Sequence, residues 1–143
     1  MTDETEREAH RDIRGAAALI EWFGYWPSFH DAEVLSVELN RSGTSRIRIH
    51  TWEMSREVDD KGFHVPRKSV VVTFVMDDLN QVRVEGFNHQ NVLMGLGVTR
   101  TGNGLRLSFN DSFGMMGAIT AGVVKIEMAP GLPADGRSAK HVS

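Results

Sequence analysis

Cysteine is absent from this chain of 143 residues, and proline is scarce, with only four residues. Without cysteine, the chain can form neither a disulfide framework nor a thiolate metal site. No apolar run approaches the roughly 18 residues that a membrane-spanning helix needs. The first ten residues are acidic and polar, whereas a secretory signal begins with a basic region followed by an apolar one. We therefore expect a cytoplasmic protein with no membrane partner.

A strong charge of either sign is also missing, because the formal net charge is −3. Residues 1–40 hold nine acids and three bases, for −6, and residues 41–143 hold ten acids and thirteen bases, for +3. A nucleic-acid-binding protein usually carries a stronger basic field. We expect no nucleic-acid partner, and we interpret the acidic first segment as a solvated helix.

The spacing of apolar residues predicts one helix followed by strands. Helical periodicity runs over about residues 11–23, and Gly24 and Pro27 then end the helix. Alternating runs follow, separated by glycine-rich and acidic turns, and turn-linked strands favour an antiparallel sheet. The predicted strands lie near residues 35–39, 46–50, 68–76, 82–84, 105–109 and 117–128, with turns at 40–44, 59–62, 77–80 and 101–104. We expect an α+β fold, in which an N-terminal helix packs on a curved, mainly antiparallel sheet of about six strands, with one short helical turn near residues 91–96.

The length suits a single domain. We place this α+β domain at residues 1–128 and expect residues 1–10 to be frayed. Residues 129–143 are rich in proline, glycine and small polar residues, and we predict a disordered tail there.

His30 and Asp31 are the most obvious candidates for catalysis. Histidine titrates near neutral pH and can act as a general base, with Asp31 or Asp111 beside it. Adjacent side chains of an extended segment point to opposite sides, however, and no nucleophile motif accompanies the pair. Asp31 and Glu33 could share a face, but no second carboxylate pair completes a metal site, so we predict none. The alternative that stays open is a small-ligand-binding protein or hydrolase that uses His30, Asp31 and Asp111 in a cleft.

Trp52 is the candidate for a protein contact. It shares one face of its predicted strand with Arg46 and Arg48, and a tryptophan beside arginines is typical of binding hot spots. Residues 53–66 could instead cover the tryptophan, which would make it structural.

Three stretches carry a resemblance to a known family. Residues 24–34 (GYWPSFHDAEV) resemble the signature of the Immunity protein 50 family of bacterial polymorphic toxin systems. Residues 87–93 (FNHQNVL) are similar to a second stretch of that family, and residues 109–114 to a third. The likeness spans about residues 20–128.

This resemblance implies a cytoplasmic antitoxin that binds a cognate toxin and blocks it, with no cofactor and no catalysis. The motif residues it carries over by position either contact the toxin or hold the fold; they are Trp26, Phe29, His30, Asp31, Asn88, Gln90 and Asn91. A homo-oligomeric structural module, joined through exposed sheet edges, is the remaining alternative. The sequence does not fix the oligomeric state.

Overall fold

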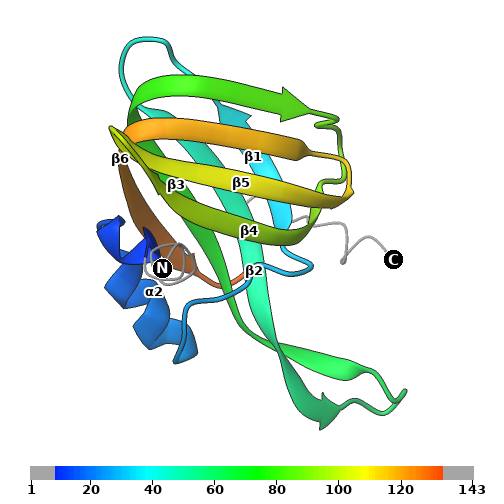
Figure 1. The fold of residues 1–143 in the computed structure, drawn as a ribbon. Coiled ribbons are helices and arrows are strands. Elements are labelled where there is room, and N and C mark those ends of the chain that lie inside the picture. Colours follow the sequence, from blue (N-terminus) through cyan, green and yellow to red (C-terminus); the bar gives the residue numbers. More distant parts are fainter. Residues whose placement is uncertain (1–8, 134–143) are drawn as a thin grey trace.

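The computed structural model describes residues 9–133, apart from the side chains of residues 111–113. A short 3-10 helix and one α-helix precede six strands (Figure 1). The helices are η1 (Ala9–Asp12) and α2 (Ala16–Phe23). The strands are β1 (Glu33–Glu38), β2 (Ser45–Val58), β3 (His64–Glu85), β4 (Val92–Thr101), β5 (Gly104–Phe113) and β6 (Met116–Pro130).

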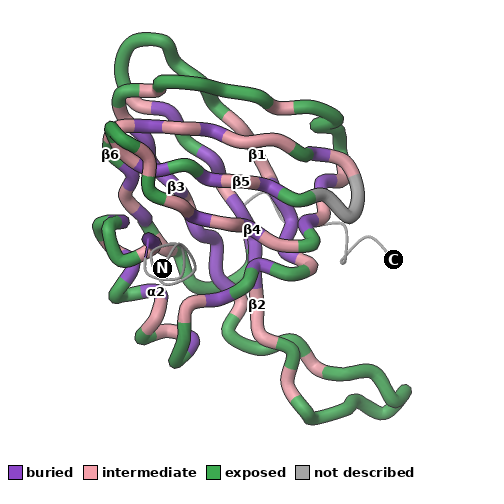
Figure 2. The backbone as a smooth tube through the Cα atoms, viewed as in Figure 1, coloured by how far each residue is buried: buried purple, intermediate pink, exposed green. Residues whose placement is uncertain are grey.

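The six strands form one antiparallel sheet that closes into a barrel in the order β1-β2-β3-β6-β5-β4. Closure pairs strands that an open sheet would leave as exposed edges. Buried residues recur along the strands of this barrel (Figure 2), and its core includes Ile47, Ile49, Phe74, Leu107 and Ile119, each 0% exposed. Burial of one such side chain contributes about 1.5–3 kcal/mol. The predicted α+β class, with a helix and a curved antiparallel sheet of six strands, is confirmed.

Helix α2 is shorter than the predicted helix of residues 11–23. Gly15 precedes α2 and Gly24 follows it, both in the left-handed region with φ of 93° and 90°. A side chain at Gly15 would bring its Cβ within 2.5 Å of the Ile126 carbonyl oxygen, so glycine allows β6 to approach closely. Leu19 and Phe23 of α2 are buried against the barrel. Among the described residues, no helix is long and apolar enough to cross a membrane.

Helix η1 is fixed to β4 by an ion pair. Arg100 of β4 donates a hydrogen bond of 2.7 Å to Asp12, and this bond lowers the pKa of the Asp12 carboxyl. Arg14 forms an isolated parallel bridge to Lys125 of β6. The N-terminal segment therefore spans the space between β4 and β6, which do not pair with each other.

The predicted turn at residues 77–80 is wrong, because β3 runs through it. Asp78 takes a left-handed conformation with φ of 59°, and the pairing with β6 shifts register between Leu79 and Gln81. One extra residue on β3 makes this a bulge, which bends a strand without ending it. The predicted strands 68–76 and 82–84 are consequently one strand of 22 residues.

The predicted helical turn near residues 91–96 is also wrong. Residues 92–96 begin β4, which pairs with β5 in antiparallel register from Val92 to Thr101. Gly95 and Gly97 hide the alternation of this strand in the sequence. The short helical turn of the fold is η1 instead, so the strand number was right although one strand was counted twice and another was missed.

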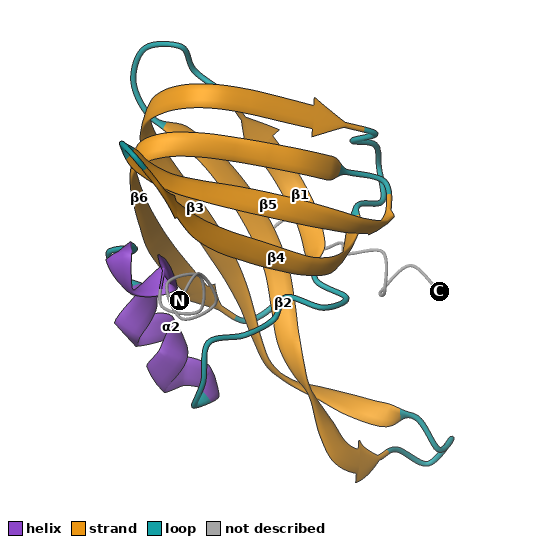
Figure 3. Ribbon diagram, viewed as in Figure 1, coloured by secondary structure: helices purple, strands orange, loops and turns teal. Residues whose placement is uncertain are grey.

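Strands β2 and β3 continue beyond the barrel as a two-stranded ribbon (Figure 3). The pairing of β1 with β2 covers Arg46 to His50, and the pairing of β6 with β3 starts at Val70. We call residues 53–67 the arm. At its tip, Asp59 Oδ1 accepts hydrogen bonds of 2.9 and 3.0 Å from the backbone N–H groups of Lys61 and Phe63, which sets the turn.

The two ends of the chain extend past the described residues. Strand β6 ends at Pro130. Residues 1–8 and 134–143, which include most of the frayed segment and tail expected from the sequence, lie outside the described residues.

Candidate protein-binding surface

The first motif stretch closes the barrel between β1 and β4. Only Glu33 and Val92 pair formally between these strands. The backbone of residues 31–34 extends this contact through three hydrogen bonds: Asp31 N–H to Leu93 O (2.8 Å), Leu93 N–H to Ala32 O (2.9 Å) and Val34 N–H to Asn91 O (2.8 Å). The chain just before β1 is therefore bonded along the start of β4.

Two residues of this stretch adopt an uncommon backbone conformation. Phe29 and Asp31 have φ of 63° and 68°. Such conformations cost on the order of 1 kcal/mol or more each for residues other than glycine. They turn the buried Phe29 ring toward Phe74 in the core, 5.8 Å between centroids, and still allow the Asp31 N–H to reach β4. Trp26 packs over the same corner, stacked on His10 at 4.6 Å. Both motif aromatics thus contact other parts of the fold.

The second motif stretch forms a compact network of amide bonds. Asn91 is 2% exposed, and its Oδ1 accepts the Asn88 N–H at 2.8 Å. Its Nδ2 donates to the carbonyl oxygens of Asn88 at 2.6 Å and Val34 at 3.4 Å. Asn88 Oδ1 in turn accepts the backbone N–H of Gln90 at 2.8 Å. Asn91 thereby joins the loop before β4 to β1.

The third stretch meets this network at Gly114, which has φ of 89°. A Cβ there would lie 2.6 Å from Gln90 O and 2.7 Å from Asn91 Oδ1, so only glycine fits. The three stretches that carry the resemblance are therefore neighbours in space. We call residues 28–34, 88–93 and Gly114 the seam, because they join β1 to β4 and close the barrel.

His30 and Asp31 lie on the outside of the seam. Their side chains are 59% and 50% exposed, with His30 Nδ1 3.3 Å from Asp31 Oδ2. The prediction that they point apart is wrong, since residues 29–31 form a turn and not an extended segment. His30 lines a cleft of about 310 Å³ together with Trp26 and Trp52. The Asp111 side chain lies outside the described part of the chain.

The groups around this pair bear on whether it could hold a metal or activate a nucleophile. In the described part of the chain, no three histidine, aspartate or glutamate side chains gather as metal ligands. The hydroxyl of Ser28, the nearest candidate nucleophile in sequence, accepts the backbone N–H of His30 at 3.2 Å. The site offers an exposed polar pair beside aromatic rings.

Trp52 lies where the arm leaves the barrel and lines a second cavity of about 470 Å³. We call this cavity the Trp52 groove; its lining residues are His50, Trp52, Met54, Phe63, His64, Pro66 and Ser69. Met54 is 48% exposed and Phe63 67% exposed. Exposed apolar side chains around a concave site are typical of a surface that binds another molecule.

The base of the arm is held by two long-range bonds from the helix and its exit. Trp22 Nε1 donates to Lys68 O at 2.9 Å, and the Tyr25 hydroxyl donates to Glu53 Oε2 at 2.8 Å. Burial raises the pKa of Tyr25, and the bond to Glu53 raises it further. Because these bonds run from α2 and its exit to β2 and β3 at the base of the arm, they position the groove relative to the barrel.

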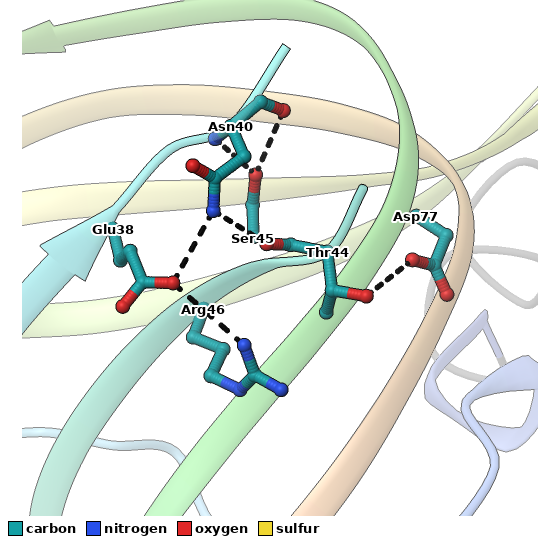
Figure 4. Close-up of polar contacts among 6 residues, drawn as sticks. All are labelled: Glu38, Asn40, Thr44, Ser45, Arg46 and Asp77. Atoms are coloured by element: carbon teal, nitrogen blue, oxygen red, sulfur yellow. Dashed lines mark hydrogen bonds and ion pairs between the residues drawn. The ribbon is translucent and has the colours of Figure 1, made fainter. Parts of the chain in front are cut away.

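Arg46 and Arg48 do not join Trp52 in this groove. They share its strand, but four to six residues away, which corresponds to about 13–20 Å along a strand. Arg46 Nη1 lies 3.7 Å from Glu38 Oε2, the oxygen that also accepts the Asn40 side-chain amide at 3.2 Å (Figure 4). Arg46 thus belongs to the network of the β1–β2 turn.

A larger cleft of about 780 Å³ lies at that other end of β2. It is open and polar, with Arg41, Asp77 and Asn80 in its lining. Because its lining is mainly polar, we regard the more apolar Trp52 groove as the better candidate for binding a protein.

Met54, Phe63 and Pro66 were not predicted from the sequence, since residues 53–66 were considered only as an alternative cover for Trp52. The sequence did contain a signal for the apolar face of the arm. Apolar residues flank the turn at 59–62 on both sides, as in a ribbon with one apolar face.

Comparison with known proteins gives one match. The family model described as Immunity protein 50 matches residues 15–130, which include the seam and the arm. Neither a curated protein nor a solved structure matches the chain.

Proposed function

Because the chain belongs to the Immunity protein 50 family, we propose that it binds a cognate bacterial toxin in the cytoplasm and neutralises it without catalysis. The observation that carries this proposal is the family match over residues 15–130. Neutralisation by occlusion requires a complementary surface and no cofactor.

The Trp52 groove and the apolar side chains of the arm supply such a surface. Met54 and Phe63 are about half or more exposed, and Trp52 is partly buried between two cavities. Aromatic residues in a partly desolvated pocket are the usual anchors of a protein interface. A projecting ribbon can also reach into a cleft that the barrel wall cannot enter.

The seam has a different role in this proposal. Phe29 and Asn91 are 1% and 2% exposed and bond or pack within the chain. We assign the family motif to closure of the barrel, with the toxin contact on the arm. In this proposal, the motif residues stabilise the fold that the family shares, and the residues of the arm determine which toxin is bound.

One observation favours a second function, namely catalysis or ligand binding at His30. The 3.3 Å contact with Asp31 and the position beside the cleft of about 310 Å³ suit a general base. Immunity function does not require this pair, so replacing His30 separates the two functions.

The experiment is inducible co-expression of the chain with each toxin domain encoded beside its gene. Growth rescue and co-purification of a complex with at least one of them is expected. A chain that rescues growth from none and co-purifies with none contradicts the proposal.

Two double variants then locate the surface. Met54→Ser with Phe63→Ser removes the apolar groups of the groove, and Met94→Ser with Phe87→Ser is the matched control, since those residues are 55% and 45% exposed elsewhere. We expect the first variant to lose at least about tenfold in affinity, as for the loss of one hot spot. Equal loss in the control would place the contact elsewhere.

A further inference from the structure

The arm has one edge that can accept another strand. On the side away from β3, residues 53–58 of β2 pair with no strand among the described residues, because the partner β1 ends its pairing at His50. This segment contains neither proline nor glycine, and its pairing with β3 shifts register between Met54 and Val58. An open edge of this kind adds a strand readily unless it is blocked.

The opposite edge of the arm is blocked by its own sequence. Pro66 lacks a backbone donor, and Lys68 has a left-handed conformation with φ of 56°. The backbone after β6 also returns to this edge, where Gly131 N–H donates to Ser69 O at 2.7 Å. Strand addition is therefore directed to the β2 side.

Charge is divided between the two edges. Residues 53–60 hold four acids and one base, for −3, and residues 61–68 hold three bases and no acid, for +3. The cross-strand ion pairs Arg67–Glu57 and Lys68–Glu53 hold this division in place. The open edge is thus the acidic one.

A second copy of the chain is a poor partner for this edge. Antiparallel pairing of two copies along residues 53–58 would bring Glu53 and Glu57 of one copy close to the same acidic side chains of the other. Like charges directly opposite in a sheet destabilise the pairing. A strand that carries basic residues would instead place opposite charges beside Glu53 and Glu57, which stabilises the pairing.

We propose that the β2 edge of the arm binds an extended basic segment of the partner protein by strand addition. This inference rests on the proposed function in that the partner is the toxin. Backbone hydrogen bonds hold the added strand, and its basic side chains lie beside Glu53 and Glu57. Because side chains alternate along a strand, every second one faces the side of the ribbon that carries Trp52 and Met54, where a large apolar residue fills the groove.

The experiment uses two synthetic peptides of about ten residues, a length that suits the free edge. One alternates lysine with valine around a central tryptophan, and the other has glutamate in place of lysine. Binding to the full chain is followed by the backbone amide NMR shifts at low salt, where charge effects are largest. We expect the basic peptide to shift amides of residues 52–58 and to bind at least about tenfold more tightly than the acidic peptide.

A pair of charge variants makes the test specific. Glu57→Lys reverses charge on the open edge, and Glu85→Lys is the control, since Glu85 also pairs with an arginine on an exposed strand. The Glu57 variant should lose the preference for the basic peptide and the control should keep it. Equal affinity for both peptides, or shifts confined to other strands, overturns the inference.

The proposed toxin neutralisation and the proposed strand addition can be disproved independently of each other. A chain that neutralises a toxin but shows no preference between the peptides retains the proposed function and loses strand addition. If the chain binds the basic peptide at residues 52–58 but neutralises no toxin, strand addition is supported and the proposed immunity function is contradicted.

Discussion

Asn91 offers the sharpest test of the role that the structure gives to the seam. Its side chain is 2% exposed and makes three hydrogen bonds, of 2.8 and 2.6 Å with Asn88 and 3.4 Å with Val34 O. Alanine would leave a buried N–H and two carbonyl oxygens with fewer partners, and each such bond contributes about 1 kcal/mol or more. We expect Asn91→Ala to lower the free energy of unfolding by about 3 kcal/mol.

That loss is a large part of the 5–15 kcal/mol that stabilises a typical domain, and it corresponds to a fall in Tm on the order of 10 °C. The assay is urea unfolding followed by tryptophan fluorescence, with exposed Asn80→Ala as the control. A change of less than about 0.5 kcal/mol, the range of an ordinary surface substitution, would refute the assignment of Asn91 to barrel closure.

Asn91→Asp adds a dependence on pH to the same test. A carboxylate would face the carbonyl oxygens of Asn88 and Val34, and both burial and these oxygens raise its pKa in the folded state. A carboxyl with a raised folded pKa destabilises the fold at high pH, and the loss is relieved as pH falls through that pKa. Stability relative to the parent chain should therefore recover on acidification for Asn91→Asp and not for Asn91→Ala.

Three further results are expected. Gly114→Ala should lower the free energy of unfolding by more than the roughly 1 kcal/mol of left-handed strain expected for Gly43→Ala. The reason is that only the alanine at position 114 brings its Cβ within 2.7 Å of polar atoms, Gln90 O and Asn91 Oδ1. Urea unfolding measures both variants, and equal effects would contradict the close packing at Gly114. The single tyrosine, Tyr25, should ionise at higher pH in the folded than in the unfolded chain, so its contribution to stability is lost as pH rises through the raised pKa. Absorbance titration measures the pH at which the tyrosine ionises. Glu53→Gln should lower that pH in the folded chain. His30→Ala should leave toxin neutralisation within about twofold, a difference well under 1 kcal/mol, and a loss of rescue with the fold intact would favour the second function.

The sequence was a sound guide to fold class because periodicity reports which face of an element is buried. The helix and most strands were recognised in this way. The errors have local causes. The bulge in β3 inserts Asn80 without breaking the strand, and an acidic Asp77-Asp78 pair there looks like a turn. Gly95 and Gly97 of β4 remove the apolar alternation.

The candidate site was predicted less completely. Trp52 was singled out because it is a large aromatic residue on a polar strand face, and it lines the groove. Arg46 was grouped with it from alternation alone, which gives the face but not the distance along the strand. Convergence of the motif stretches could not be seen in one sequence, because contacts between β1, β4 and Gly114 depend on closure of the barrel.

Hydrogen exchange of the chain with and without its cognate toxin tests the central claim most directly. We expect new protection of backbone amides in residues 52–58, while the seam amides of Asp31, Val34 and Leu93 are already protected in the free chain by their hydrogen bonds between the start of β1 and the start of β4. Protection confined to residues 82–89 or to the surface around His30, with no change in the arm, would contradict it.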